Sequence, residues 1–337
     1  MFNNKNILIT GATGYFGREF ILRLLKYYKP KKVIVFSRDE AKQYEMQNDV
    51  IYKKYLKILR FFIGDVRDAE RLKLAMRKVD FVIHAAALKH VPSAEYNPTE
   101  CIRTNILGAE NVIRASIDCN VKKVIALSTD KAANPINIYG ATKLASDKLF
   151  VAANNLSGSK GPKFAVVRYG NVFASRGSVV PFFKKLIKDN INYFPITDKK
   201  MTRFVITIQE AIDLVFNSFR FIVGGEIIVP KIPSIKIVDL AKAMDKTKKL
   251  KIVGIRPGEK LHEILCPRDD ARLTIEFKKH MIIIPATNFK YQIKKFKKNK
   301  FNGAGKFVNN DFQYDSGSNI NFLSVEKIKK LLKSTNT

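Results

Sequence analysis

Short apolar runs alternate with amphipathic segments along the first half of the chain. The runs lie at 6–10, 32–36, 60–63, 81–84, 124–127 and 164–168. Runs without polar alternation are typical of strands that are buried on both faces of a parallel sheet. Helical patterns follow at 18–28, from Asn105 and after Pro135. This order predicts an α/β fold, a Rossmann-type doubly wound parallel sheet with right-handed crossovers.

The regular alternation weakens after about residue 175. Mixed patterning at 179–188, 207–221 and 235–244 predicts a smaller substrate-binding part, interleaved with the last strands of the sheet. We therefore expect a cofactor-binding sheet domain over 1–174, to which some later segments return, and a substrate-binding part mainly over 175–286. The basic segment 287–337 follows, with a partly loose loop at 287–320 and an amphipathic helix at 322–332.

Three glycines follow the first strand in the pattern G-x-x-G-x-x-G, at Gly11, Gly14 and Gly17. Glycine permits the tight turn and the close approach of backbone to a pyrophosphate at the start of a helix. The position between a strand and a helix makes a dinucleotide site the favoured interpretation. The turn adds Thr13, Tyr15 and Phe16 as candidate cofactor contacts.

The second strand ends in Ser37-Arg38, where an NAD-specific site carries an acid for the ribose hydroxyl. Arg38, with Lys42 nearby, suits a 2′-phosphate instead, and the charges therefore favour NADP over NAD. The competing interpretation of Arg38 is an ordinary solvated cation.

Further cofactor contacts are expected after the third and fourth strands. Asp65 can accept a hydrogen bond from an adenine amino group, while Asp68 is the better candidate for a helix N-cap. The small side chains of Ala85 and Ala86 let a flat cofactor lie against the backbone. The remaining candidates are Val66, Lys89, Asn105 and Val172.

The strand at 124–127 runs into Ser-Thr-Asp-Lys at 128–131, at the edge of the sheet where such folds bind ligands. Tyr139 and Lys143 follow, and their spacing places both on one face of a helix. An ammonium beside a phenol favours the phenolate, which can take the proton of an alcohol as a nicotinamide accepts the hydride. The structural alternatives are a local ion pair at Asp130-Lys131 and a surface pair on the helix.

Lys and Arg number 61 against 30 Asp and Glu, a formal charge of +31. The basic residues are spread along the chain without a nucleic-acid motif, so we expect a Lys-rich solvated surface, an anionic substrate and no nucleic-acid partner. Three cysteines and four histidines lack metal-ligand spacing, which predicts a reduced compartment and no metal. Without a signal peptide or an apolar run of about 20 residues, we expect a soluble cytoplasmic protein with no membrane partner.

The glycine turn and the Tyr139-x-x-x-Lys143 pair together resemble the extended short-chain dehydrogenase/reductase superfamily. Lys131 stands where retaining sugar-nucleotide 4,6-dehydratases carry Glu, and Ser-Thr-Asp-Lys resembles the inverting UDP-N-acetylglucosamine 4,6-dehydratases of pseudaminic acid and related pathways. Segments 37–40, 84–98, 168–183, 195–198, 201–204 and 254–264 agree with this resemblance. Departures are found at Ala12, Tyr15, Phe173, Ala174 and Val205.

The resemblance implies a mechanism on UDP-N-acetylglucosamine. Tyr139 takes the proton of the 4-hydroxyl while Lys143 lowers the tyrosine pKa and holds the ribose. Lys131 then removes the C5 proton, which requires a neutral amine, made so by desolvation or a nearby cation such as Lys143. Asp130 protonates the departing 6-hydroxyl, and C5 is inverted. Thr129 either hydrogen-bonds the 4-hydroxyl or only caps the turn.

Substrate contacts are expected from a second set of residues. A guanidinium suits phosphate oxygens and a carboxylate suits ribose hydroxyls, so Arg256 and Glu259 would hold the uridine diphosphate. Lys89, Asn171 and Arg203 complete the set, and the resemblance implies a homo-oligomer that pairs through helices. The alternatives are a retaining 4,6-dehydratase or a 4-epimerase, a catalytically inactive NADP-binding interaction protein, and a nucleic-acid-binding protein.

Overall fold

A ten-stranded sheet forms the centre of the computed structural model, which describes all residues except 176, 287–292, 300–302 and 336–337. The strand order is β18-β14-β15-β10-β6-β5-β4-β1-β2-β3. The strands from β3 to β10 pair in parallel, and the last three at the other edge pair antiparallel. Their bounds are β1 Asn6–Thr10, β2 Lys32–Ser37, β3 Leu59–Ile63, β4 Phe81–His84, β5 Lys123–Thr129, β6 Lys163–Tyr169, β10 Ile227–Pro230, β14 Thr274–Glu276, β15 His280–Ile283 and β18 Lys306–Phe307.

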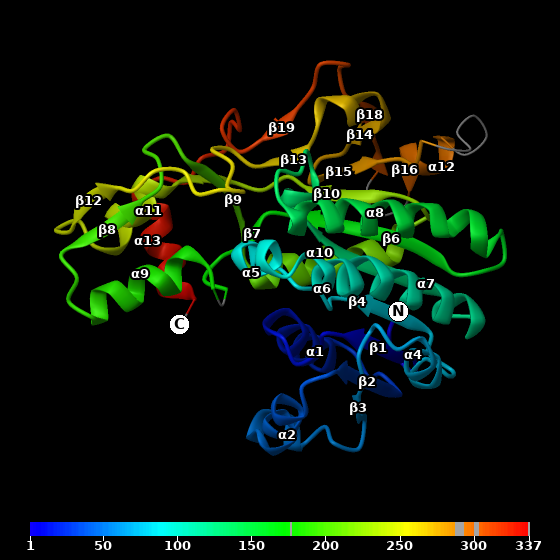
Figure 1. Ribbon diagram of the computed structural model, residues 1–337. Coiled ribbons are helices and arrows are strands. Elements are labelled where there is room, and N and C mark those ends of the chain that lie inside the picture. The colour runs from blue at the N-terminus through cyan, green and yellow to red at the C-terminus, as the bar shows by residue number, and fades with distance from the viewer. Residues whose placement is uncertain (176, 287–292, 300–302, 336–337) are drawn as a thin grey trace.

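Helices cover the sheet in two groups, which confirms the doubly wound fold. One group packs α1 against α10, and the other packs α7 against α4 and α8. Figure 1 shows α7 and α8 lying side by side along the sheet. Their bounds are α1 Tyr15–Tyr27, α2 Glu40–Asn48, α3 Val50–Lys53, α4 Ala69–Ala75, α5 Val91–Tyr96, α6 Pro98–Ile102, α7 Gly108–Asp118, α8 Ile138–Ser157 and α10 Ile208–Phe221.

The first strands agree with the sequence because their side chains are buried on both faces. In β1, every residue from Ile7 to Thr10 is completely buried, so no polar alternation is needed. Asn105 does not begin a regular helix, as the pattern predicted. It lies in a π-helical turn, η1 Arg103–Leu107, between α6 and α7. Such single turns are frequent at functional sites.

A smaller part with its own apolar cores lies to the left of the sheet in Figure 1. One core joins α11 to α13, and the other joins α9 and α11 to the parallel pair β8–β12. A three-stranded sheet, β11-β9-β7, adjoins it. The bounds are β7 Asn171–Val172, α9 Val179–Lys188, β8 Tyr193–Ile196, β9 Thr202–Ile206, β11 Ser234–Lys236, α11 Ile237–Met244, β12 Lys249–Ile252 and α13 Val325–Ser334.

The expectation of a loose loop at 287–320 is wrong for the described residues of that stretch. They form α12 Ile293–Lys297, the pair β16 Lys298–Asn299 and β17 Gly303–Ala304, strand β18, and β19 Tyr314–Asp315, which pairs with β13 Ile264–Cys266. The Tyr314 hydroxyl also accepts from the Ile232 amide at 2.9 Å and donates to its carbonyl at 2.8 Å. These tertiary contacts order a stretch whose own periodicity is weak, while 287–292 and 300–302 lie outside the described residues.

Over the described residues, no helix is long and apolar enough to cross a bilayer.

The first glycine of the turn combines a left-handed φ with a close approach. Gly11 has φ +65°, and a Cβ there would meet the Ala86 backbone at 2.9 Å. Gly158 has the same φ, but a Cβ there meets nothing within 4 Å. We predict that Gly158→Ala costs about 1–3 kcal/mol from backbone strain. Gly11→Ala should cost about 1–3 kcal/mol more, because the loop after β4 must move. Urea unfolding of both variants measures the difference, and equal losses would contradict the close approach.

Candidate active site

The glycine turn leaves the start of α1 open to an anion. Gly14 is the N-cap, with no side-chain cap hydrogen bond and no acidic residue in the first turn. The first amide groups of a helix have no partners within the helix and carry a partial positive charge. At Gly17, a Cβ would meet the Ala12 carbonyl oxygen at 2.5 Å, so the helix packs closely on the turn. The residues present fit a dinucleotide pyrophosphate.

Arg38 and Lys42 differ in how closely their charged groups are paired with carboxylates. The Arg38 side chain is 56% exposed, and its guanidinium lies 3.9 Å from Asp65 Oδ2. The Lys42 ammonium is already paired with Asp39, which also caps α2. The Ser37 hydroxyl is buried and accepts from Gln43 at 3.0 Å. Of the two predicted phosphate contacts, Arg38 is the less closely paired, and both contacts stay predictions.

The carboxylate of Asp65 is bound within its own loop. Oδ2 lies 2.8 Å from the Arg67 guanidinium, and Oδ1 accepts from the Arg67 amide at 2.9 Å. Burial acts to raise the pKa of Asp65, but the Arg67 contacts outweigh it and lower the pKa. The predicted adenine contact is not supported, because the side chain already has a charged partner. Asp68 caps α4, as predicted, by accepting from the Arg71 amide.

The loop after β4 is held from both sides. The Thr10 hydroxyl accepts from the amides of Ala85 at 3.1 Å and Ala86 at 3.2 Å. The buried Asn105 amide bonds both backbone groups of Leu88 at 2.9 Å and donates to Thr142 of α8 at 3.0 Å. The prediction that Asn105 contacts cofactor is therefore replaced by a structural role, since protein groups occupy both ends of its side chain. Lys89 is exposed on the same loop.

The short turn after β5, η2 Asp130–Ala132, contains the centre of the site. Lys131 Nζ lies 3.1 Å from Asp130 Oδ1 and 3.1 Å from Glu263 Oε1. Both carboxylates are almost completely buried, at 0% and 2% exposure, whereas the Lys131 side chain keeps 23%. Within the described structure, Asp130 Oδ2 and Glu263 Oε2 are buried without a hydrogen-bond partner. Lys131 is therefore the member of this cluster that a ligand can reach.

The two carboxylates change the expected charge of Lys131. Burial acts to lower the lysine pKa, but Asp130 and Glu263 outweigh it and raise the pKa above its usual value. The carboxylates thus favour the ammonium, whereas an amine made neutral by desolvation or by Lys143 was expected from the sequence. Burial raises the pKa of Asp130. Burial acts in the same direction on Glu263, but Lys131 and Arg203 outweigh it and lower its pKa.

Glu263 was missed in the sequence, although it lies within segment 254–264, which supported the resemblance. No spacing rule connects it with Lys131, because the contact is made across two distant parts of the chain. Arg203 lies at 3.7 Å from Glu263 Oε1 and donates to the Thr202 carbonyl at 2.7 Å. Its guanidinium is buried on these protein groups, so the structure does not support Arg203 as a free substrate contact.

Tyr139 is buried on α8, next to the same turn. Burial raises its pKa to about 12, while Lys131 and the Thr129 hydroxyl act to lower it. The cation that acts to lower the pKa of Tyr139 is therefore Lys131, whereas Lys143 was expected to have this effect. Lys143 Nζ donates to the Leu127 carbonyl at 2.7 Å, and burial lowers its pKa.

Thr129 caps the turn and also contacts Asp130. Its hydroxyl accepts from the Lys131 amide at 3.3 Å and donates to Asp130 Oδ1 at 3.0 Å. The capping alternative is confirmed, and contact with a sugar hydroxyl stays a prediction.

The predicted nucleotide-binding loop, residues 254–263, lies against the turn η2 and the start of α8. We call η2 the catalytic turn because the resemblance assigns the chemistry to it. Asn137 caps α8 and donates to the Gly258 carbonyl at 2.8 Å, and Lys260 donates to the Ala133 carbonyl at 2.5 Å. Arg256 is exposed on this loop. Glu259 is half-buried, and its Oε2 has no hydrogen-bond partner among the described residues. On the neighbouring β7, Asn171 and Val172 are half-buried.

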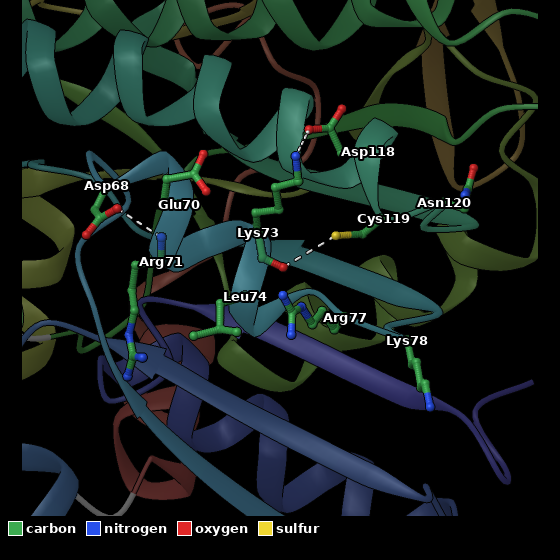
Figure 2. Close-up of a pocket in the computed structure, with 10 residues that line it drawn as sticks. All are labelled: Asp68, Glu70, Arg71, Lys73, Leu74, Arg77, Lys78, Asp118, Cys119 and Asn120. Carbon is green, nitrogen blue, oxygen red and sulfur yellow. Dashed lines mark hydrogen bonds and ion pairs between the residues drawn. The ribbon is translucent and has the colours of Figure 1, made fainter.

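A surface hollow elsewhere does not compete with this site. Figure 2 shows it lined by charged side chains of α4 and the end of α7. Lys73 pairs with Asp118 at 2.9 Å, and Cys119 donates to the Lys73 carbonyl at 3.4 Å. None of the residues that line it belongs to the cluster around Lys131.

A buried ion pair joins β6 to α8 next to the site. Arg168 of β6 lies 3.0 Å from Asp147 Oδ2 of α8, and Ser128 of β5 donates to the same oxygen at 2.8 Å. We predict that Asp147→Asn costs about 3–5 kcal/mol of unfolding free energy, because it leaves Arg168 buried without a counter-charge. The matched control is Asp213→Asn, which removes a half-exposed partner of Arg23 and should cost about 1 kcal/mol or less. Chemical denaturation measures the unfolding free energy of both variants. Equal losses of unfolding free energy would show that the buried pair stabilises the fold no more than the half-exposed pair does.

Comparisons with known proteins agree with this geometry. A family model described as polysaccharide biosynthesis protein matches residues 7–285. An inverting UDP-N-acetylglucosamine 4,6-dehydratase from Campylobacter jejuni is 55% identical, over 99% of both chains. A UDP-glucose 4-epimerase from Rickettsia bellii is 44% identical, over 80% of both chains.

Among solved structures, Pen from Bacillus thuringiensis is 36% identical with a TM-score of 0.86, over 99% of both chains. Further structures at 18–23% identity share the fold, and several of them hold NAD. The chain therefore belongs to the polysaccharide biosynthesis protein family, on the fold of the extended short-chain dehydrogenase/reductases.

Proposed function

We propose that this protein dehydrates UDP-N-acetylglucosamine across C5 and C6, after oxidation at C4, and inverts C5. The product is a UDP-2-acetamido-2,6-dideoxy-L-arabino-hex-4-ulose. The observation that carries the proposal is the Lys131 ammonium, which lies between Asp130 and Glu263 and is the reachable member of their cluster. A relative that bears this activity as its name is 55% identical over almost the whole chain.

The substrate would lie between the catalytic turn and the loop at 254–263. Arg256 is exposed for the diphosphate, and the unpartnered Glu259 oxygen suits a ribose hydroxyl. Lys89 and Asn171 stay candidate contacts for the sugar or the nicotinamide ribose. This placement puts the hexose beside Lys131.

The cofactor is proposed to be NADP. The amides of the glycine turn at 11–17 would hold its pyrophosphate, Arg38 its 2′-phosphate, and Lys143 its ribose. Ala85, Ala86 and Val172 would border the rings. When bound, the nicotinamide supplies reversible hydride transfer with the sugar.

The chain's own residues move protons. Tyr139 takes the proton of the 4-hydroxyl, and the resulting C4 ketone acidifies the hydrogen on C5. Lys131 removes that hydrogen, and Asp130 supplies the proton with which the 6-hydroxyl leaves as water. Asp130 has no exposed surface, so we place the half-buried Thr129 hydroxyl as the relay between them. The hydride would then return to C6 while C5 is reprotonated, and the proton that Tyr139 took from the 4-hydroxyl balances this step. Arrival of the C5 proton on the opposite face inverts C5.

The place of the reaction in the cell is proposed from the same resemblance. The product would feed a pseudaminic acid-like surface glycan, and the enzyme would act in the cytoplasm as a homo-oligomer.

The second candidate is a retaining 4,6-dehydratase or a 4-epimerase, and the Rickettsia bellii relative, named a UDP-glucose 4-epimerase, favours the epimerase. An epimerase needs proton transfer at O4 but no acid or base at C5 and C6. In that case the Asp130–Lys131–Glu263 cluster would have no chemical role, although it buries two carboxylates.

Incubation with UDP-N-acetylglucosamine and NADP tests the function. We predict loss of one water from the sugar nucleotide by mass, and inverted C5 by proton NMR. Lys131→Ala should abolish water loss, because no base remains for C5. Lys73→Ala, which alters a surface pair with Asp118, is the control and should react normally. A water-loss product with retained C5, or a 4-epimer, would refute the proposal.

Cofactor choice gives a separate prediction. Arg38→Ala should weaken NADP binding about tenfold while NAD binding changes little, because only NADP carries the 2′-phosphate. Lys42→Ala is the matched control, since its ammonium is already paired with Asp39. Titration calorimetry of the wild type and both variants with NADP and with NAD measures the six affinities. Equal weakening of NADP and NAD by Arg38→Ala would contradict the assignment.

A further inference from the structure

Glu263 has no part in the proton transfers proposed above. It directly precedes β13, and its Oε1 lies 3.1 Å from Lys131 Nζ. Its backbone is fixed, because its amide donates to the Ser316 hydroxyl at 2.9 Å and its carbonyl accepts from the Ser316 amide at 2.8 Å. The carboxylate is thus held in place by the C-terminal segment and not by Lys131 alone.

We infer that Glu263 is a positioning residue that holds the Lys131 ammonium against Asp130, so that one proton shift between them makes the base and the acid together. The inference rests on the proposed function. It adds Glu263 to the pair of Lys131 and Asp130, and it explains why that pair carries one positive and one negative charge.

The proton count balances along this path. In the resting state Lys131 is an ammonium and Asp130 a carboxylate, 3.1 Å apart. Transfer of one proton from Nζ to Oδ1 leaves a neutral amine and a carboxylic acid. The amine then takes the C5 proton, and the acid's proton passes through Thr129 to O6 as the C6–O bond breaks and water leaves. The pair returns to ammonium and carboxylate, ready for another turnover.

Glu263 acts on this cycle by charge and by position. Its negative charge stabilises the ammonium before the shift and again after C5 has lost its proton. Glu263 Oε2 and Asp130 Oδ2 are both buried without a hydrogen-bond partner among the described residues. The two carboxylates therefore concentrate negative charge around one ammonium. Lys131 also faces Arg203 and Tyr139, and Glu263 faces Arg203 and Lys260, so both ends of the cluster are charged.

The test is Glu263→Gln, with Glu276→Gln as the matched control. Glu276 of β14 pairs with Lys231 at 2.7 Å, and this ion pair involves none of these groups. We expect Glu263→Gln to lower kcat about 100-fold, with little change in KM for UDP-N-acetylglucosamine. Loss of the Glu263 charge should also shift the basic limb of the kcat–pH profile about one pH unit lower, because the Lys131–Asp130 pair then loses its proton more easily. The control should match the wild type in both.

Two further readouts separate this role from a merely structural one. Single-turnover absorbance should show C4 oxidation at the wild-type rate in Glu263→Gln, since Tyr139 is intact, followed by slow water loss. Glu263→Asp keeps the charge and should restore the basic limb while kcat stays low.

Glu263→Gln with wild-type kcat and an unmoved limb would overturn the inference while the proposed function stands. A loss of kcat with an unmoved limb would also overturn it, because a structural defect alone gives that result. A wild-type protein that forms no dehydrated product would instead refute the proposed function.

Discussion

An ammonium between two buried carboxylates is the interaction on which the rest of this structure depends. Lys131 bridges Asp130, at the end of a central strand, and Glu263, which directly precedes β13. Removing the ammonium would leave the Asp130 carboxylate buried without its counter-charge, which costs several kcal/mol. The contact therefore does two things at once. It favours the charged form of the lysine, and it joins the turn after β5 to the segment that precedes β13.

The parallel sheet explains why these groups meet where they do. Strands β1, β4, β5 and β6 run in the same direction, so the glycine turn, the loop after β4 and the catalytic turn all emerge at one edge. Asn105, Asn137 and the Arg168–Asp147 pair connect these loops to α8. The chemistry is thus placed by side chains that touch no substrate.

The sequence allowed the six early strands, the glycine turn and the Lys131–Tyr139 region to be predicted, because each of these is a local pattern. Glu263 and the charge of Lys131 could not be predicted, because both depend on a contact between distant segments. Asp65, Lys42, Arg203 and Asn105 were assigned to ligands from residue type alone. Each instead has protein partners that only the fold brings near, such as Arg67 for Asp65. The described residues of segment 287–320 were misjudged for the same reason.

The most direct test of the central claim is a crystal structure with UDP-N-acetylglucosamine and oxidised cofactor bound. The account predicts Lys131 Nζ about 3–3.5 Å from C5 of the hexose, still in contact with Asp130 and Glu263. A hexose whose C5 lies out of reach of this nitrogen, with Lys131 facing solvent or the carboxylates alone, would contradict it.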